Sequence, residues 1–442
     1  MRIERLLGVG VFVVAAIAAS APRAATEIQF WHAMDGALGD ELKALAGRFN
    51  AGQKDYVVVP EFKGSYDETL AAGMAAALAG KAPHVLQVYD VGTANMMYAA
   101  RLAKPLHQLM RETGERFDQK AFVPAVASYY ADAKGNLVSL PFNTSTPVLY
   151  VNRRLLREAG VKPGAELKTW YQLQEVLLEV REKYPESCGL TTTWPSWVML
   201  ENVLAWHNEE FATRGNGYDG LDAQLKFNTR LAIRHISLMT AWTKGKIFSY
   251  SGRRDEGERR FARGECSMLT ASSAAYGGLA RDAKLEFAVL PLPYYDDISD
   301  AAPYNTLMGG ASLWAMNGKS AGEYKGVAKF FAFLAQPEVQ AAWHQRTGYL
   351  PITRAAYELT ARSGYYEKYP GTDVALRELL DGKRVPQAHS RGIRLGNHLM
   401  IRAVVDEELE KAWAALKPPK QALDDAVARG NDLLRRFERA NR

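Results

Sequence analysis

Hydroxyl side chains, glycines and aromatic residues gather in five short segments, each placed at the end of a predicted strand. Ser and Thr hydroxyls and glycine amides at such turns donate hydrogen bonds to anionic oxygens without adding charge. Open α/β sheets bind their ligands at these strand ends. A phosphate or a carboxylate is therefore the favoured ligand. The segments are LPFNTSTPVLYVN (140–152), WPSWVMLEN (194–202), LTASS (269–273), MGGASLW (308–314) and TGYLPI (347–352).

Two tryptophans three positions apart, Trp194 and Trp197, can supply flat walls against the C–H face of a polyol. The same spacing fits two side chains packed in a core, and taken alone it favours the core. For any single Ser or Tyr, a local turn hydrogen bond or a half-buried ring is likewise the default interpretation.

Motifs for metal binding and nucleotide binding are missing from the sequence. It contains no HExxH, no CxxC and no GxxxxGK[ST], and its eight histidines are scattered. We therefore expect no metal and no cofactor. Two carboxylates, Asp35 and Asp90, could form a glycosidase pair, but the sequence does not give their separation.

The elements that must position these segments follow an alternation of short apolar runs and helical periodicity. Three runs form a β-α-β-α-β series, which is typical of a parallel sheet flanked by helices. They are EIQFWH (27–32), YVVVPEF (56–62) and HVLQVY (84–89). Four later runs predict a second sheet, namely CGLTTT (188–193), CSMLTA (266–271), LEFAVLPL (285–292) and ASLWAM (311–316).

Beyond Gly318 the pattern is helical and ends with helices near 399–416 and 420–438, separated by Pro418 and Pro419. The predicted fold class is α/β with two lobes, each a mainly parallel sheet flanked by helices.

Length, composition and charge limit the classes of protein to which the chain can belong. The 442 residues suggest two or three domains, and 48% hydrophobic with 24% charged residues excludes a disordered chain. The net charge of +6 comes without a run of like charges, so nucleic acid is not expected. Arg2 and Arg5 precede an apolar run, 6–19, and small residues, which predicts a signal peptide over 1–24 and export to the periplasm.

The sequence has two cysteines, Cys188 and Cys266. In an oxidising compartment they could pair if their strands are neighbours. Two buried, unpaired small side chains are the favoured interpretation.

Taken together, the segments resemble the family of periplasmic sn-glycerol-3-phosphate-binding receptors of ATP-binding-cassette importers, over nearly the full length. The resemblance implies two lobes, 25–145 with about 305–345, and 146–304 with about 346–442, that close around a ligand. The motifs that carry it are QFWHAMDGALG (29–39), LQVYDVGTANMM (86–97), PFNTSTPVLY (141–150), GGASLW (309–314), WHQRTGYLPIT (343–353), RLGN (394–397) and VVDEELE (404–410).

The resemblance also implies the ligand-binding residues. Those expected on the first lobe's side are Tyr66, Asp90, Ser145 and Gly310, and those expected on the second are Trp194, Ser272, Tyr349 and Arg402, with Trp197 beside Trp194. Arg402 would offer a full positive charge and a fork matched to phosphate. Asp90, where family members carry Glu, would accept hydrogen bonds from ligand hydroxyls. Without the resemblance, an ion pair on a surface helix is the favoured interpretation of Arg402, and a helix N-cap explains Asp90 equally well.

The resemblance implies a monomeric solute-binding protein, not an enzyme. It would capture sn-glycerol 3-phosphate or glycerophosphodiesters such as glycerophosphocholine, and deliver them to the permease subunits of the importer. Two alternatives stay open on the sequence: a secreted glycerophosphodiester hydrolase, and the same fold binding a neutral sugar, which would leave Arg402 without a use.

Overall fold

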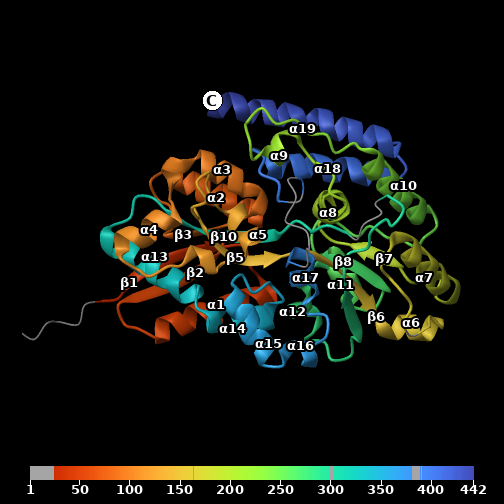
Figure 1. The fold of residues 1–442 in the computed structure, drawn as a ribbon, viewed down its shortest axis with the longest axis horizontal. Coiled ribbons are helices and arrows are strands. Elements are labelled where there is room, and N and C mark those ends of the chain that lie inside the picture. Colours follow the sequence, from red (N-terminus) through yellow and green to blue (C-terminus); the bar gives the residue numbers. More distant parts are fainter. Residues whose placement is uncertain (1–23, 163, 299–302, 381–388, 390) are drawn as a thin grey trace, which may run out of the picture.

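The computed structural model describes residues 24–162, 164–298, 303–380, 389 and 391–442. They form two lobes side by side, each built on a sheet with helices on its faces (Figure 1). The predicted signal peptide lies outside the described residues, except for Ala24. Among the helices that are described, none combines the length and the apolar composition that crossing a bilayer requires.

The first lobe holds a six-stranded sheet. Its order is β2 (Tyr56–Phe62), β1 (Thr26–His32), β3 (Val85–Tyr89), β10 (Gly309–Met316) and β4 (Ala103–Lys104), with β5 (Leu140–Ser145) also paired to β10. β1 is parallel to β2 and β3, as the β-α-β-α-β pattern predicts. β10 is antiparallel to all three of its partners.

Helices around this sheet bury aromatic side chains against it. The ring of Phe330 lies 6.1 Å from that of Phe30 on β1 and 5.2 Å from that of Phe49, so two helices share one core with the sheet. The helices of this lobe are α1 (Gly36–Ala51), α2 (Tyr66–Leu78), α3 (Thr93–Tyr98), α4 (Leu106–Thr113), α5 (Pro124–Tyr129) and α13 (Ala321–Leu334).

The second lobe holds a four-stranded sheet in the order β7 (Leu190–Thr192), β8 (Met268–Ser272), β6 (Pro147–Asn152) and β9 (Phe287–Leu290). Trp170 is fully buried against it, with its ring 6.3 Å from that of Trp242 and 6.4 Å from that of Tyr295. The helices here are α6 (Arg153–Ala159), α7 (Trp170–Lys183), α8 (Asn202–Trp206), α9 (Thr213–Gly217), α10 (Arg230–Lys244), α11 (Glu256–Ala262), α18 (His398–Trp413) and α19 (Pro419–Asn441).

The prediction of mainly parallel sheets is wrong, because both sheets are mixed. In the second sheet only β7 and β8 are parallel, while β6 is antiparallel to β8 and β9. β5 passes through Thr146 directly into β6, so the chain changes lobes between two strands. A strand that arrives from the other lobe has no βαβ crossover to force it parallel to its neighbours. Apolar runs predict strands, but neither their direction nor the sheet they join. ASLWAM, expected in the second sheet, forms β10 of the first sheet instead.

Further short helices lie below and between the lobes in Figure 1. Thr146 anchors this layer, because its hydroxyl donates to the carbonyl of Ala375 at 3.2 Å. The helices are α12 (Ala275–Leu279), α14 (Pro337–Thr347), α15 (Arg354–Arg362), α16 (Tyr365–Lys368) and α17 (Val374–Leu380).

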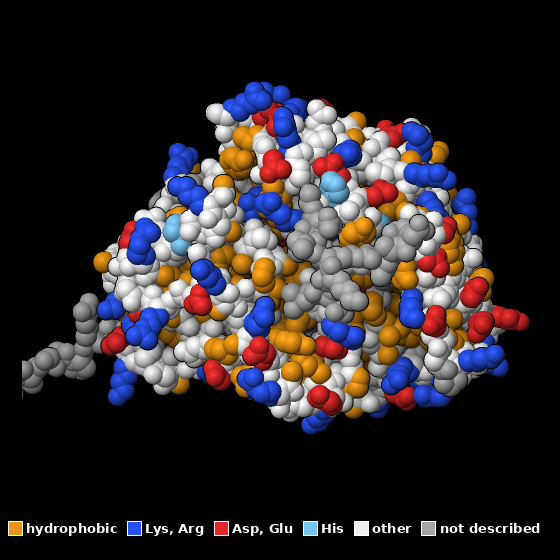
Figure 2. Space-filling view, viewed as in Figure 1, with side chains coloured by type: hydrophobic (Ala, Val, Ile, Leu, Met, Phe, Trp, Pro, Cys, Tyr) orange, Lys and Arg blue, Asp and Glu red, His pale blue; other side chains and the backbone are white. Residues whose placement is uncertain are grey.

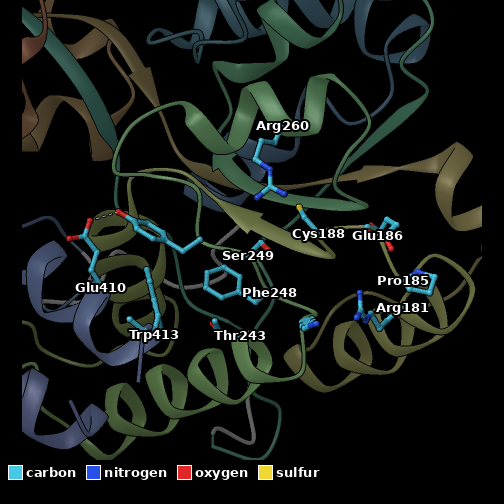
Figure 3. Close-up of a pocket in the computed structure, with 14 residues that line it drawn as sticks. Arg181, Pro185, Glu186, Cys188, Thr243, Phe248, Ser249, Arg260, Glu410 and Trp413 are labelled. Carbon is cyan, nitrogen blue, oxygen red and sulfur yellow. Dashed lines mark hydrogen bonds between the residues drawn. The ribbon is translucent and has the colours of Figure 1, made fainter. Parts of the chain in front are cut away.

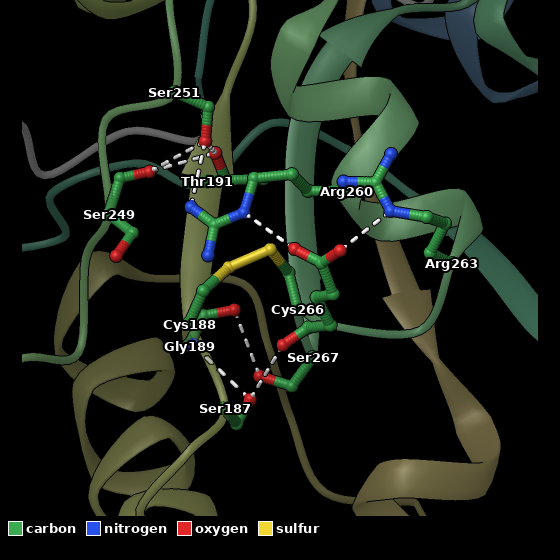
Figure 4. Close-up of a disulfide and its surroundings, with 11 residues drawn as sticks. Ser187, Cys188, Gly189, Thr191, Ser249, Ser251, Arg260, Arg263, Cys266 and Ser267 are labelled. Atoms are coloured by element: carbon green, nitrogen blue, oxygen red, sulfur yellow. Dashed lines mark hydrogen bonds and ion pairs between the residues drawn. A yellow bond between two sulfur atoms is a disulfide. The ribbon is translucent and has the colours of Figure 1, made fainter.

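Cys188 and Cys266 form a disulfide, which corrects the favoured interpretation of two unpaired cysteines (Figure 4). Each cysteine stands two residues before a strand, and those strands, β7 and β8, are parallel neighbours. Parallel pairing therefore places the two Cα atoms 4.7 Å apart. The sequence alone does not show which strands are neighbours.

Candidate ligand-binding site

A cavity of about 510 Å³ lies between the two lobes and takes its lining from both. Asp90 follows directly after β3, Ser145 ends β5 and Ser272 ends β8, so the cavity collects the carboxyl ends of strands from both sheets. The structure brings all nine predicted residues to this one cavity: Tyr66, Asp90, Ser145, Trp194, Trp197, Ser272, Gly310, Tyr349 and Arg402.

The glycine pair at the start of β10 lets the backbone form one wall. Gly310 has φ +101°, and a Cβ atom there would lie 1.8 Å from the carbonyl oxygen of Asn143. A Cβ on Gly309 would lie 2.6 Å from the ring of Trp197. Larger residues would therefore displace β5 or the tryptophan.

Aromatic rings form further walls, and each is held by packing behind it. Tyr66 stacks on Tyr89 with centroids 4.9 Å apart, and its hydroxyl accepts a hydrogen bond from Asn143 Nδ2 at 2.8 Å. Tyr349 stacks on Trp343 at 6.0 Å. Trp197 is largely core, as its spacing alone suggested, but its edge also reaches the cavity.

Trp194 has a backbone conformation that is unusual for a bulky residue, with φ +49°. Left-handed backbone of this kind costs about 1–3 kcal/mol and is found mainly at functional sites. The guanidinium of Arg254 lies 4.8 Å from the Trp194 ring centroid and forms an ion pair with Asp67 on α2. Because Arg254 precedes α11 and α2 belongs to the first lobe, this pair joins the lobes at the cavity.

Arg402 does not offer a free positive charge. Its Nη2 donates to Asp90 Oδ2 at 2.8 Å and to Glu201 Oε2 at 2.6 Å, and its Nε donates to Glu201 Oε1 at 2.8 Å. His398 Nε2 lies 3.1 Å from Glu201 Oε1. The expectation of an uncompensated guanidinium is corrected: the arginine is paired, as a surface arginine would be, but the pairs are buried.

Burial and pairing act differently on the two carboxylates. Burial raises the pKa of Asp90 above its usual value, and the attraction of Arg402 offsets this only in part. For Glu201, burial acts in the same direction, but Arg402 and His398 outweigh it and lower the pKa to about 2. Burial would lower the pKa of Arg402, but Asp90 and Glu201 raise it above the usual value. Arg402 and Glu201 are therefore charged at neutral pH.

Hydrogen-bond donors remain available around the cavity. Among the described residues, Arg402 Nη1 and the Ser145 hydroxyl have no recorded partner. The Ser272 oxygen accepts from the Ala274 amide at 3.1 Å, the local turn bond that its residue type suggests, and its own proton stays free to donate. Asp90 starts a 3₁₀ turn but its side chain caps no helix. Neutral donors and one guanidinium nitrogen can thus meet an anionic oxygen.

Sequence reasoning missed several charged residues of this region, among them Glu201, Arg254 and Glu258. Glu201 lies within WPSWVMLEN, where it resembles one acid on an apolar helix, and only its contact with Arg402 reveals its role. Arg254 and Glu258 line the cavity from the segment around α11, where charges of both signs alternate and look like a solvated face. Asp35 also lines the cavity, at the start of α1.

One sequence feature resembles a hydrolase motif. Residues 318–322 read GKSAG, the spacing of a nucleophile elbow. Ser320 instead caps α13, where its oxygen accepts from the Glu323 amide at 3.3 Å, and it does not line the cavity.

A second cavity, of about 530 Å³, lies within the second lobe beside the disulfide (Figure 3). It is lined by Arg181, Cys188 and Trp413 among others, and contains none of the nine predicted residues. On the face shown in Figure 2, basic and acidic side chains are interspersed, without a broad patch of one sign.

Comparison with known proteins agrees with this geometry. Residues 44–372 match the family of bacterial extracellular solute-binding proteins. The chain is 50% identical over 420 residues to the sn-glycerol-3-phosphate-binding periplasmic protein UgpB of Yersinia enterocolitica, covering 95% of this chain and 94% of that protein. It is 49% identical over 420 residues to the UgpB of Salmonella typhimurium, with 95% of each chain covered.

A solved structure has the same fold. UgpB from Mycobacterium tuberculosis in complex with glycerophosphocholine superposes with a TM-score of 0.77 at 21% identity, covering 93% of this chain and 99% of that one. At this identity the likeness concerns the arrangement of the two lobes.

Proposed function

This chain belongs to the bacterial extracellular solute-binding proteins, and we propose that it captures sn-glycerol 3-phosphate and glycerophosphodiesters in the periplasm. It delivers them chemically unchanged to the permease subunits of an ATP-binding-cassette importer. The relatives that are half identical over 95% of the chain are named as binding proteins for this phosphate ester, and not as enzymes.

The observation that carries the proposal is the convergence on one cavity between the lobes of all nine residues that the family resemblance implies. Serine hydroxyls and Arg402 Nη1 would bind the phosphate oxygens, and the aromatic walls would cover the C–H groups of glycerol. Asp90 would accept from a glycerol hydroxyl while it stays 2.8 Å from Arg402.

The lobes we propose consist of residues 25–145 with about 305–345, and 146–304 with about 346–442. The sheet strands agree with this division, because β1 to β5 and β10 form one sheet and β6 to β9 form the other. Ligand contacts from both groups of residues would favour the closed arrangement of the lobes.

Titration calorimetry of the purified mature chain tests the function. We expect one-to-one binding of glycerol 3-phosphate and of glycerophosphocholine, and no heat with maltose. Phosphorus NMR of each ligand after prolonged incubation should show an unchanged spectrum. Absence of binding to every glycerophosphate, or release of choline or phosphate, would refute the proposal.

A further inference from the structure

One carboxylate in the cavity has no partner. Glu258 of α11 lines the cavity, and the structure records no hydrogen bond or ion pair for it among the described residues. Burial, together with the charge of Asp255 and against that of Arg259, raises its pKa to about 7. A half-buried carboxylate without a partner destabilises the folded protein, so its place in a binding cavity calls for a functional explanation.

The surroundings of Glu258 are small or aromatic. A Cβ on Gly278 of α12 would lie 3.3 Å from Glu258 Oε1, and Gly278 lines the same cavity. Two ionisable groups on other elements interact electrostatically with Glu258, namely Tyr150 on β6 and Tyr349 after α14. The negative charge of Glu258 raises the pKa of both hydroxyls beyond the effect of burial. No described cation therefore balances Glu258 from another element.

The charge of the whole cavity lining also favours a ligand that carries a cation. Among the described residues, four carboxylates line the cavity, Asp35, Asp90, Asp255 and Glu258, against two guanidinium groups, Arg254 and Arg402. Of the four, Asp255 is paired with Arg259, which lies outside the lining. Arg254 is engaged with Asp67, and Arg402 with Asp90 and Glu201. A ligand that carries only negative charge meets a lining that is already acidic. A ligand with a phosphate at one end and a cation at the other can balance it.

We propose that Glu258 is a specificity-determining residue that recognises a cationic head group on a glycerophosphodiester, such as the quaternary ammonium of choline or the ammonium of ethanolamine. Tyr349, whose hydroxyl pKa is raised by the charge of Glu258, contributes to this part of the cavity an aromatic ring of the kind that attracts such cations. This inference rests on the proposed function and deepens it. The phosphodiester would sit with its glycerol end toward Asp90 and its head group toward Glu258.

The test compares two phosphodiesters of equal phosphate charge. Glycerophosphocholine carries a cationic head group, and glycerophosphoglycerol carries a neutral one. We expect Glu258→Gln to weaken glycerophosphocholine binding about tenfold while changing glycerophosphoglycerol by less than about twofold. Glu179→Gln, on the exposed side of α7, is the matched control and should change neither affinity.

Proton release gives a second readout that a merely structural role would not move. With a pKa of about 7, Glu258 is part protonated at neutral pH, and a nearby cation favours its charged form. Glycerophosphocholine should therefore release a fraction of a proton when it binds at pH 7, measured as a dependence of the calorimetric heat on buffer ionisation enthalpy. Glu258→Gln should abolish this release, and glycerophosphoglycerol should not produce it.

Equal losses for the two diesters in Glu258→Gln, or full retention of glycerophosphocholine binding, would overturn the inference. Thermal unfolding of the variant confirms that it is folded, because removal of a half-buried carboxylate without a partner should not lower its midpoint. Failure of wild type to bind any glycerophosphate would refute the proposed function instead, so the two failures are distinguishable.

Discussion

At the scale of single residues, Arg402 has two tasks that a substitution would disturb together. It is paired with Asp90 and Glu201, and it lines the cavity with an Nη1 that has no partner among the described residues. Breaking a buried ion pair by removing one partner costs about 3–5 kcal/mol, because the other charge stays buried. Arg402→Ala should therefore lower the free energy of unfolding on this scale, measured with urea, and should weaken ligand binding by more than tenfold.

A triple variant separates the two tasks. Arg402→Met combined with Asp90→Asn and Glu201→Gln removes all three charges, so it should recover most of the stability that Arg402→Ala loses. It should still fail to bind glycerol 3-phosphate, because the guanidinium nitrogen that would bind the phosphate is gone. Recovery of binding along with stability would show that Arg402 acts on the fold alone.

Glu201 links the same cluster to acid stability. Its pKa is lowered from 4.5 to about 2, so its ionised form stabilises the folded protein above pH 4.5, and this contribution is lost as the pH falls toward 2. The shift corresponds to about 3 kcal/mol. Asp90, whose pKa is raised by burial, acts in the opposite sense. Between pH 5 and 2.5, wild type should lose more unfolding free energy in urea than Glu201→Gln does. Parallel losses would contradict this assignment.

Residue type and position at strand ends indicated the segments that line the cavity, and the family resemblance indicated the residues within them, but neither gave the charge balance of the site. Ser145 and Ser272 fall where open sheets bind ligands, and both line the cavity. Glu201 and Arg402 are 201 positions apart in sequence, and only the fold brings α18 to the π-helical turn Trp197–Glu201 that carries Glu201. A pair of this kind leaves no local signal in composition or periodicity.

At the scale of elements, the apolar runs predicted most strands within a few residues. YVVVPEF coincides with β2. Of the two C-terminal helices, α18 ends before the predicted proline break and α19 begins at Pro419. The directions of β6 and β10 could not be predicted, because they depend on where the chain changes lobes. The disulfide was missed for the same reason, since its formation follows from the pairing of β7 with β8.

The disulfide joins the amino-terminal ends of β7 and β8, while the cavity lies at the carboxyl end of β8. Cys188→Ser with Cys266→Ser should therefore lower the free energy of unfolding without changing ligand affinity. For a crosslink that spans 78 positions, the expected loss is about 2–5 kcal/mol. Urea unfolding measures the loss of stability, and calorimetry on the same preparation measures the ligand affinity. A large loss of affinity would mean that the strand ends move together.

At the scale of the whole molecule, two ion pairs cross between the lobes at the cavity. Asp67 of α2 pairs with Arg254 before α11, and Asp90 after β3 pairs with Arg402 of α18. Both pairs can form only when the lobes are close, so they favour closure by themselves, and a ligand adds to this only through its extra affinity for the closed form. The chain that links the lobes directly at Thr146 is well placed to act as a hinge.

Arg254→Gln should therefore shift the free protein toward the open form while leaving the ligand able to close it. A compact body of this size has a radius of gyration of roughly 22 Å, and an open two-lobed form exceeds it. By small-angle scattering, the free variant should be larger than free wild type, and saturating glycerophosphocholine should bring both to the same value. The variant's apparent affinity should fall in proportion to the decrease in the fraction of free molecules that are closed. Identical curves for the two free proteins would show that the Asp67 pair does not contribute to closure, and identical curves with and without ligand would show a cavity that is closed throughout.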